Sequence, residues 1–262
     1  MESSLNSTKS LSTLLMVLSL VAPAVYGQAT AAASAPPAVA NPVDPASIQA
    51  LKDMGAHLQS LGRFRTSTML SGERVLTDGQ KLQHIAYATL DAERPDRLRA
   101  RMWSARSERE LFFDGKTFTI FVPAQKYYSQ VEFSGSNAEL VERLEQRFGV
   151  EIPLSDLFKW GTPAAPVDKI ESAMNAGQDF VGDDLCDHYA FRQGKFDWQI
   201  WITTGSKPLP RKLVITHRTD EARPQSVSII DWNLKPVFSA STFRFSPPKG
   251  ATRIEIVPVK SK

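Results

Sequence analysis

The sequence predicts a mainly β domain of the α+β class, in which helices cover a curved antiparallel sheet or incomplete β-barrel. Residues 196–218 hold two alternating runs joined by a loop. In the first run Trp198 and Ile200 fall on one face and Trp201 on the other, which is typical of an antiparallel strand. Asp-Gly turns between further β-prone runs predict hairpins. Two stretches with apolar residues at helical spacing predict the covering helices.

The first half of the chain is predicted to contain one helix and then a meander of strands. The helix covers residues 45–61, where apolar residues recur at helical spacing before Gly62. Turns at 77–80 and at Asp114-Gly115 predict two hairpins. The predicted strands are residues 64–76, 81–90, 96–104, 111–113, 116–122 and 127–133.

The second half is predicted to begin with a helical insertion and to return to strands. Residues 137–149 carry an apolar stripe with charged residues elsewhere, and residues 152–160 favour a short helix with an apolar face. The pattern over 170–180 leaves helix and strand open. The predicted strands are residues 189–193, 197–203, 213–218, 226–234 and 242–245.

The N-terminus has the pattern of an export signal. Lys9 precedes an apolar stretch over 11–25, and small residues follow. We expect a signal peptide over 1–29, cleaved near Gly27 or Ala29, which would deliver the chain to the periplasm or outside the cell. The apolar stretch is short for a membrane span, although a retained signal anchor is the alternative. An Ala- and Pro-rich linker then covers 30–45, and a single domain covers 46–262.

Charge and cysteine content narrow the function classes. The formal net charge is +3, and no clustered basic face appears in the sequence, so nucleic acid is not an expected partner. The single cysteine, Cys186, excludes a disulfide within the chain. Stability must therefore come from packing. No membrane-spanning segment is expected in the mature chain.

Catalytic and metal-binding hypotheses find little support in the sequence. Cys186, Asp187 and His188 are consecutive, and alternate side chains of a strand point to opposite faces, so the three cannot converge on one ion. We expect Cys186 and His188 to share one face and Asp187 the other. No serine-nucleophile, phosphate-loop or zinc-protease motif is present. The chain is expected to be no enzyme and to need no cofactor, with a role for His188 in catalysis kept as a third hypothesis.

Several segments resemble a family of exported bacterial proteins (DUF2092-like) within the LolA/LolB-like lipoprotein-carrier superfamily. The early segments match the superfamily, and the late segments match the family. The early segments are RPDRLR at 94–99, FDGKT at 113–117 and PAQKYY at 123–128. The late segments are CDHYAFR at 186–192, DWQIWI at 197–202, PLPRKLVI at 208–215 and FRFSPPKGA at 243–251. The resemblance implies an incomplete β-barrel with helical lids, while the carrier role is a weaker inheritance because fold does not dictate function.

The candidate ligand-binding residues are the apolar side chains expected on the concave face of the sheet. They are Leu98, Met102, Phe118, Ile120, Trp198, Ile200, Leu213 and Ile215. The sequence leaves two interpretations open: the helices fill this face completely, or part of it holds an apolar ligand. The first function hypothesis is a periplasmic binding or carrier protein for a lipid, an acyl chain or a lipoprotein anchor. The second is an envelope protein-interaction or sensor module with a filled core.

Overall fold

The computed structural model describes residues 42–150 and 152–258. The predicted signal peptide lies outside the described residues, as does most of the predicted linker. The last linker residues are already part of the fold, because Val43 forms a bridge with Ala173 and the Asp44 side chain caps the first helix.

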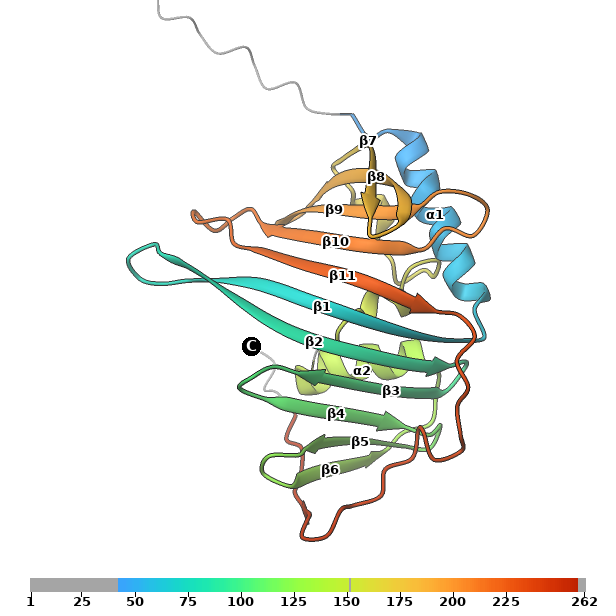
Figure 1. Ribbon diagram of the computed structural model, residues 1–262, viewed down its shortest axis with the longest axis vertical. Coiled ribbons are helices and arrows are strands. Elements are labelled where there is room, and N and C mark those ends of the chain that lie inside the picture. The colour runs from blue at the N-terminus through green and yellow to red at the C-terminus, as the bar shows by residue number, and fades with distance from the viewer. Residues whose placement is uncertain (1–41, 151, 259–262) are drawn as a thin grey trace, which may run out of the picture. The chain divides into compact units, whose positions relative to one another are not determined.

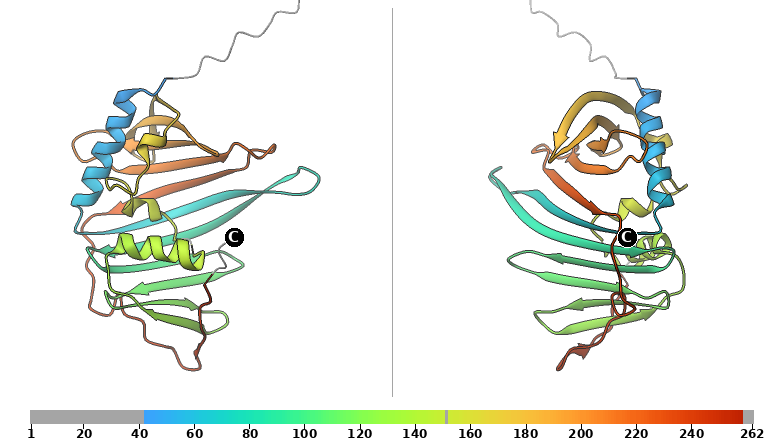
Figure 2. Two further views of the ribbon diagram at one scale, coloured as in Figure 1. Left: turned by 180° about the vertical axis from the view of Figure 1, so that it is seen from behind. Right: turned by 45° about the vertical axis from the view of Figure 1, so that its right-hand side comes forward.

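All strands of the described residues join one twelve-stranded sheet (Figure 1). The strands are β1 (Arg63–Val75), β2 (Lys81–Glu93), β3 (Arg97–Trp103), β4 (Glu108–Phe113), β5 (Thr117–Val122), β6 (Tyr127–Glu132), β7 (Ser172–Val181), β8 (Asp184–Gln193), β9 (Phe196–Thr203), β10 (Pro210–His217), β11 (Gln225–Asn233) and β12 (Thr252–Arg253). Their order is β12-β6-β5-β4-β3-β2-β1-β11-β10-β9-β8-β7. Pairing is antiparallel throughout except between β12 and β6. The sheet is strongly curved and does not close, so the predicted fold class is confirmed (Figure 2).

Two α-helices lie against the concave side of this sheet (Figure 2). Helix α1 (Pro45–Ser60) begins where Asp44 accepts hydrogen bonds from the Ala46 and Ser47 amides. Helix α2 (Asn137–Phe148) begins with a capping box between Ser136 and Glu139 and ends at Gly149, whose φ of 61° is left-handed. Both helices were predicted within a residue of their bounds.

Two local predictions differ from the structure, and one segment that was left open is now assigned. The predicted short helix over 152–160 is a 3₁₀ turn, η1 (Ser155–Phe158), and a second turn, η2 (Val167–Lys169), follows it. Residues 170–180, for which the sequence left helix and strand open, form the edge strand β7. Its side chains do not alternate between buried and exposed as those of a covered strand do.

The predicted strand over 242–245 is wrong, because this segment is a turn and an irregular stretch. Its aromatic residues are fixed by packing instead of strand pairing. Phe243 is buried against Phe238 at 5.1 Å between ring centroids. The ring of Phe245 contacts Phe112, Phe121 and Tyr128 at 5.1–5.4 Å on the convex face.

One large hydrophobic core lies between the sheet and the helices. Leu58 from α1, Leu144 from α2 and Phe158 from η1 are fully buried against it. Each buried side chain of this size contributes about 1.5–3 kcal/mol relative to an exposed position. The helices are therefore held by the same concave apolar face that carries the candidate ligand-binding residues.

Candidate ligand-binding face of the sheet

Strand register places the predicted site residues on one face. Cross-strand partners share a face of a sheet. Ile200 pairs with Leu213, and Trp198 pairs with Ile215. On strands β3–β5, Phe113 pairs with Leu98 and Phe118, and Leu111 pairs with Ala100 and Ile120. All eight residues belong to or line the concave face.

Burial divides these eight residues into two groups. Leu98, Phe118 and Ile200 are 0% exposed, and Ile120 and Leu213 are 9% and 8% exposed. Met102, Trp198 and Ile215 are only partly buried. The first five are core residues beneath the helices, and the last three lie toward the hairpin turns at 76–80, 194–195 and 218–224.

The same division runs across neighbouring strands. On β1 the concave side chains are buried as far as Thr68, and beyond it burial no longer alternates. The last buried concave residues of the other strands are Ala88 on β2, Ala100 on β3, Ile200 on β9, Leu213 on β10 and Ile230 on β11. We call the buried part the covered half. The open half comprises Leu70, Ala86, Met102, Trp198 and Ile215 together with the concave residues nearer the turns, which include the exposed Leu82 and Phe196.

The covered half contains little free space. At its boundary with the open half, Met102, Ile120 and Ile152 are among the residues that line a cavity of about 20 Å³. That volume is room for about one water molecule. At this place the sheet and the segment after α2 pack with little space between them.

Space is free above Gly72 in the open half. An ideal Cβ added to Gly72 would meet nothing within 4 Å. Gly72 lies on the concave face, as the register partner of His84 on β2. Trp198 is held by stacking on Phe191, with 4.2 Å between the ring centroids. A partly exposed aromatic side chain in a fixed orientation is a suitable contact for an apolar ligand.

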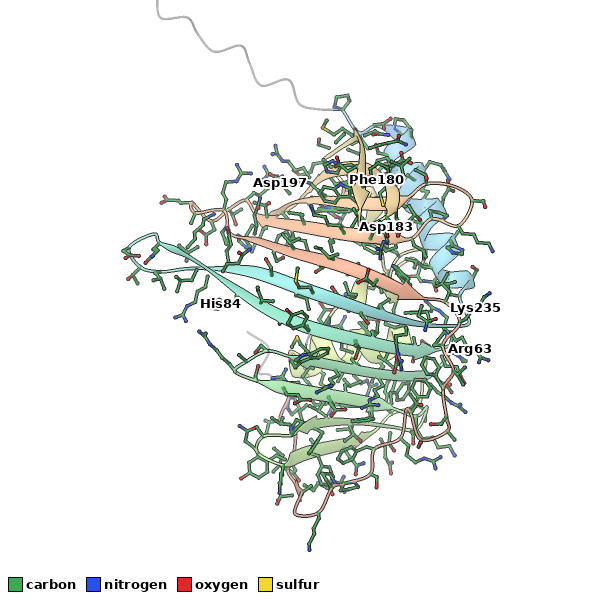
Figure 3. The ribbon with its side chains drawn as sticks, in the orientation of Figure 1. Arg63, His84, Phe180, Asp183, Asp197 and Lys235 are labelled. Atoms are coloured by element: carbon green, nitrogen blue, oxygen red, sulfur yellow. The ribbon has the colours of Figure 1, made fainter. Side chains whose placement is uncertain are left out.

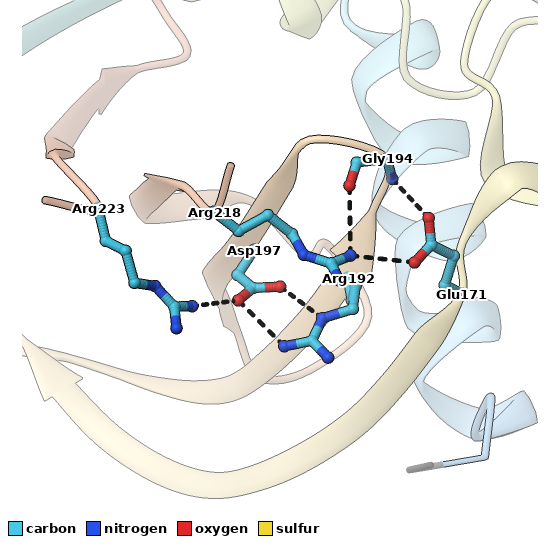
Figure 4. A network of polar contacts seen from close by, with 6 residues as sticks. All are labelled: Glu171, Arg192, Gly194, Asp197, Arg218 and Arg223. Atoms are coloured by element: carbon cyan, nitrogen blue, oxygen red, sulfur yellow. Dashed lines mark hydrogen bonds and ion pairs between the residues drawn. The ribbon is translucent and has the colours of Figure 1, made fainter. Parts of the chain in front are cut away.

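A network of charges borders the open half next to Trp198 (Figure 4). Asp197 accepts hydrogen bonds from Arg192 and Arg223, and Glu171 accepts from Arg218 and from the Gly194 amide. The Arg192 hydrogen bond lowers the pKa of Asp197, and the Gly194 amide is the main cause that lowers the pKa of Glu171. Both carboxylates are therefore ionised and fully engaged at neutral pH.

A second recess lies between α1 and the segment that follows η1. Its volume is about 240 Å³, and Leu51, Trp160 and Val167 are among its lining residues. Drug-sized ligand pockets begin at about 300 Å³. On one side of the recess Gly55 and Gly161 allow a close approach of two backbones: an ideal Cβ on Gly55 would lie 2.5 Å from the Gly161 nitrogen. In the sequence, the one sign of this recess is Gly55, a glycine inside the helical pattern.

Cys186 and His188 lie on the convex face, where both are packed against neighbouring side chains. Cys186 is fully buried with Val181, Trp201 and Val214, and burial raises its pKa to about 11. The ring of His188 stacks on Trp201 at 3.9 Å. The two residues share a face, as the alternation predicted. Among the described residues, no group of three or more His, Cys, Asp or Glu side chains could hold a metal ion.

A family described as "Predicted periplasmic protein (DUF2092)" matches residues 47–257. The chain belongs to this family. The resemblance to this family stated from the late sequence motifs is thereby confirmed. A search of the curated proteins found no match. Within residues 42–150 and 152–258, no helix has the length and apolar character needed to cross a membrane.

Solved structures with a similar backbone are distant in sequence. An uncharacterised conserved protein from Thermus thermophilus is 10% identical, with a TM-score of 0.47 over 80% of this chain and 99% of that chain. LprF from Mycobacterium bovis is 10% identical, with a TM-score of 0.42 over 80% and 99%. A LolA superfamily protein from Nitrosomonas europaea is 9% identical, with a TM-score of 0.38 over 76% and 97%.

Proposed function

We propose that this chain is a periplasmic, non-catalytic binding or carrier protein for an apolar ligand: a lipid, an acyl chain or a lipoprotein anchor. The observation that carries the proposal is the change in burial along one continuous concave face. The strands keep their apolar concave positions beyond the reach of the helices, so Met102, Trp198 and Ile215 stay partly exposed. Apolar surface that is only partly covered is a feature of ligand-binding grooves.

The free energy of binding would come from removing apolar surface from water. Burial of each CH₂ group of an acyl chain is worth about 0.8 kcal/mol. The ligand would lie on the open half, along Trp198 and its partner Ile215, and would need no covalent chemistry.

The periplasmic location rests on two observations. The N-terminal stretch has the pattern of an export signal, with Lys9 before the apolar residues 11–25. The family to which the chain belongs is described as periplasmic. Cleavage near Gly27 or Ala29 is part of the same proposal and is measured by N-terminal sequencing of the exported protein.

The test compares two tryptophans on opposite faces of the sheet. Trp198→Ala should weaken uptake of a fluorescent fatty-acid probe by the purified mature protein. Trp103→Ala is the matched control, since Trp103 is also partly buried but stacks on Tyr87 on the convex face. The carrier hypothesis fails if wild-type protein takes up no probe and organic extracts of gently purified protein contain no lipid by mass spectrometry.

A protein-interaction or sensor module is the second candidate function. It is favoured by β7, a sheet-edge strand on which Phe180 is 72% exposed (Figure 3). Unpaired edge strands offer backbone hydrogen bonds to a partner. Pull-down from periplasm and lipid extraction of the same sample separate the two functions, because only this second one predicts a bound protein without a bound lipid.

A further inference from the structure

The recess beside α1 is a hollow separate from the open half of the sheet. The described residues that line it belong to α1 or to the segment 160–167, and none of them belongs to a strand. Leu51 and Val167 also pack against the hydrophobic core, so the wall of the recess is continuous with the core. The recess and the open half therefore share no lining residue within the part of the chain that the structure describes.

The two segments that form the recess are fastened to each other. Gln59 Nε2 on α1 donates a hydrogen bond to the Trp160 carbonyl oxygen at 2.6 Å. The close backbone approach at Gly55 and Gly161 joins the same two segments, and a Cβ on either glycine would meet the other backbone at 2.4–2.5 Å. The recess is therefore preformed, and a ligand that enters it does not have to order the protein around itself.

Two polar side chains in the lining are hydrogen-bond donors without a partner. Among the described residues, the Lys52 ammonium group has no ion pair and the Trp160 indole N–H has no hydrogen bond. The third polar side chain is engaged, because Thr162 Oγ1 donates to the Lys159 carbonyl oxygen at 2.6 Å. No carboxylate belongs to the described lining. Unengaged donors, one of them a cation, match an acceptor that carries negative charge.

The volume of the recess limits the size of its ligand. A dry cavity of about 150 Å³ admits benzene, and the recess holds about 240 Å³. We propose that the recess binds a small free carboxylic acid whose apolar part has the size of one or two fused aromatic rings. The apolar part lies against Leu51 and Val167, and the carboxylate is attracted to Lys52. This inference goes beyond the proposed carrier function, because both the site and the size of the ligand differ.

The experiment compares 2-naphthoate with its uncharged analogue 2-naphthylmethanol by isothermal titration of the purified mature protein at pH 7. We expect 2-naphthoate to bind with a Kd of about 1 mM or below, and more tightly than the alcohol. Lys52→Gln should weaken 2-naphthoate about two- to fivefold, the range of an exposed charge pair, and leave 2-naphthylmethanol unchanged. Lys195→Gln is the matched control, because Lys195 is exposed in the β8–β9 turn and does not line the recess.

A second variant fills the recess. Ala56 is an exposed residue of α1 in the lining, so Ala56→Leu should weaken both ligands at least about tenfold by occupying their space. Ala46→Leu should bind both as the wild type does, because Ala46 is exposed on the same helix and does not line the recess. Leucine is a good helix former, so both helices should fold.

Trp198→Ala distinguishes the recess from the open half. It should leave the affinity for 2-naphthoate unchanged, while Ala56→Leu should leave uptake of the fatty-acid probe unchanged. The inference is overturned, and the proposed function left standing, if wild type shows no saturable binding of 2-naphthoate or binds the alcohol equally well. A loss of 2-naphthoate affinity in Trp198→Ala as large as that in Ala56→Leu would overturn it too. If only the fatty-acid probe fails to bind, the proposed function fails and the recess site stands. Should Ala56→Leu shift the unfolding midpoint, the Lys52→Gln comparison still decides.

Discussion

The covered and open halves of the concave face consist of the same strands, yet they differ in what lies above them. Ile200 and Ile215 sit on adjacent strands, and the first is fully buried while the second is not. Their local sequence patterns are equivalent, since the neighbours of each residue along its strand point to the convex face. What separates them is whether a helix reaches that position. Alternation therefore identifies a face of a sheet, but the length and placement of the covering helices decide where core ends and ligand surface begins.

The largest expected difference between the halves is in stability. Ile200→Ala should lower the free energy of unfolding by about 2–5 kcal/mol, because it opens a cavity in a filled core. Ile215→Ala should lower it by about half as much, because solvent already reaches that side chain. Urea unfolding of both variants measures the contrast. Equal losses would mean that the open half is packed as tightly as the covered half.

A second comparison uses two glycines. Gly55→Ala should cost about 1–3 kcal/mol, because the added methyl group meets the Gly161 backbone and pushes α1 away. Gly72→Ala should be neutral or stabilising by about 0.4–1 kcal/mol, since the methyl group enters free space and the unfolded chain loses freedom. Thermal unfolding of both variants is the measurement. A large loss for Gly72→Ala would show that the space above the open half is occupied.

Much of the fold could be predicted from the sequence because local signals were strong. The Asp114-Gly115 turn and the apolar stripe of α2 each specify one element, and both were predicted close to their final bounds. The strand predicted over 242–245 failed because Phe243 and Phe245 alternate as strand residues do, while their rings pack against other aromatic residues. A period of two cannot distinguish these cases.

The candidate site could be predicted only in part. The face of every proposed residue followed from alternation, and the register places Leu98 and Trp198 alike on the concave side. The sequence could not show which of them is accessible to a ligand, because accessibility depends on contacts with α1 and α2, which are distant in sequence.

The smallest expected effects concern two aspartates whose pKa values move in opposite directions. Burial near the covered half raises the pKa of Asp156, whereas hydrogen bonding to Arg192 lowers the pKa of Asp197 beside the open half. The unfolded value for both is 3.8. An acid with a raised native pKa weakens the fold above its unfolded value, because the unfolded chain then releases the proton more readily. An acid with a lowered native pKa strengthens the fold above its unfolded value, and this contribution disappears as the pH falls through the native pKa.

At pH 7, Asp156→Asn should therefore raise the free energy of unfolding, and Asp197→Asn should lower it by about 0.2–1 kcal/mol, the value of an exposed ion pair. As the pH falls, the gain from Asp156→Asn should vanish by about pH 3.8, while the loss from Asp197→Asn should persist to that point and shrink only below it. Urea unfolding of both variants and wild type between pH 7 and pH 3 follows the two differences. If they shrink over the same pH range, or if Asp156→Asn destabilises the protein at pH 7, the contrast between a desolvated carboxyl group under the helices and a paired one at the rim is wrong.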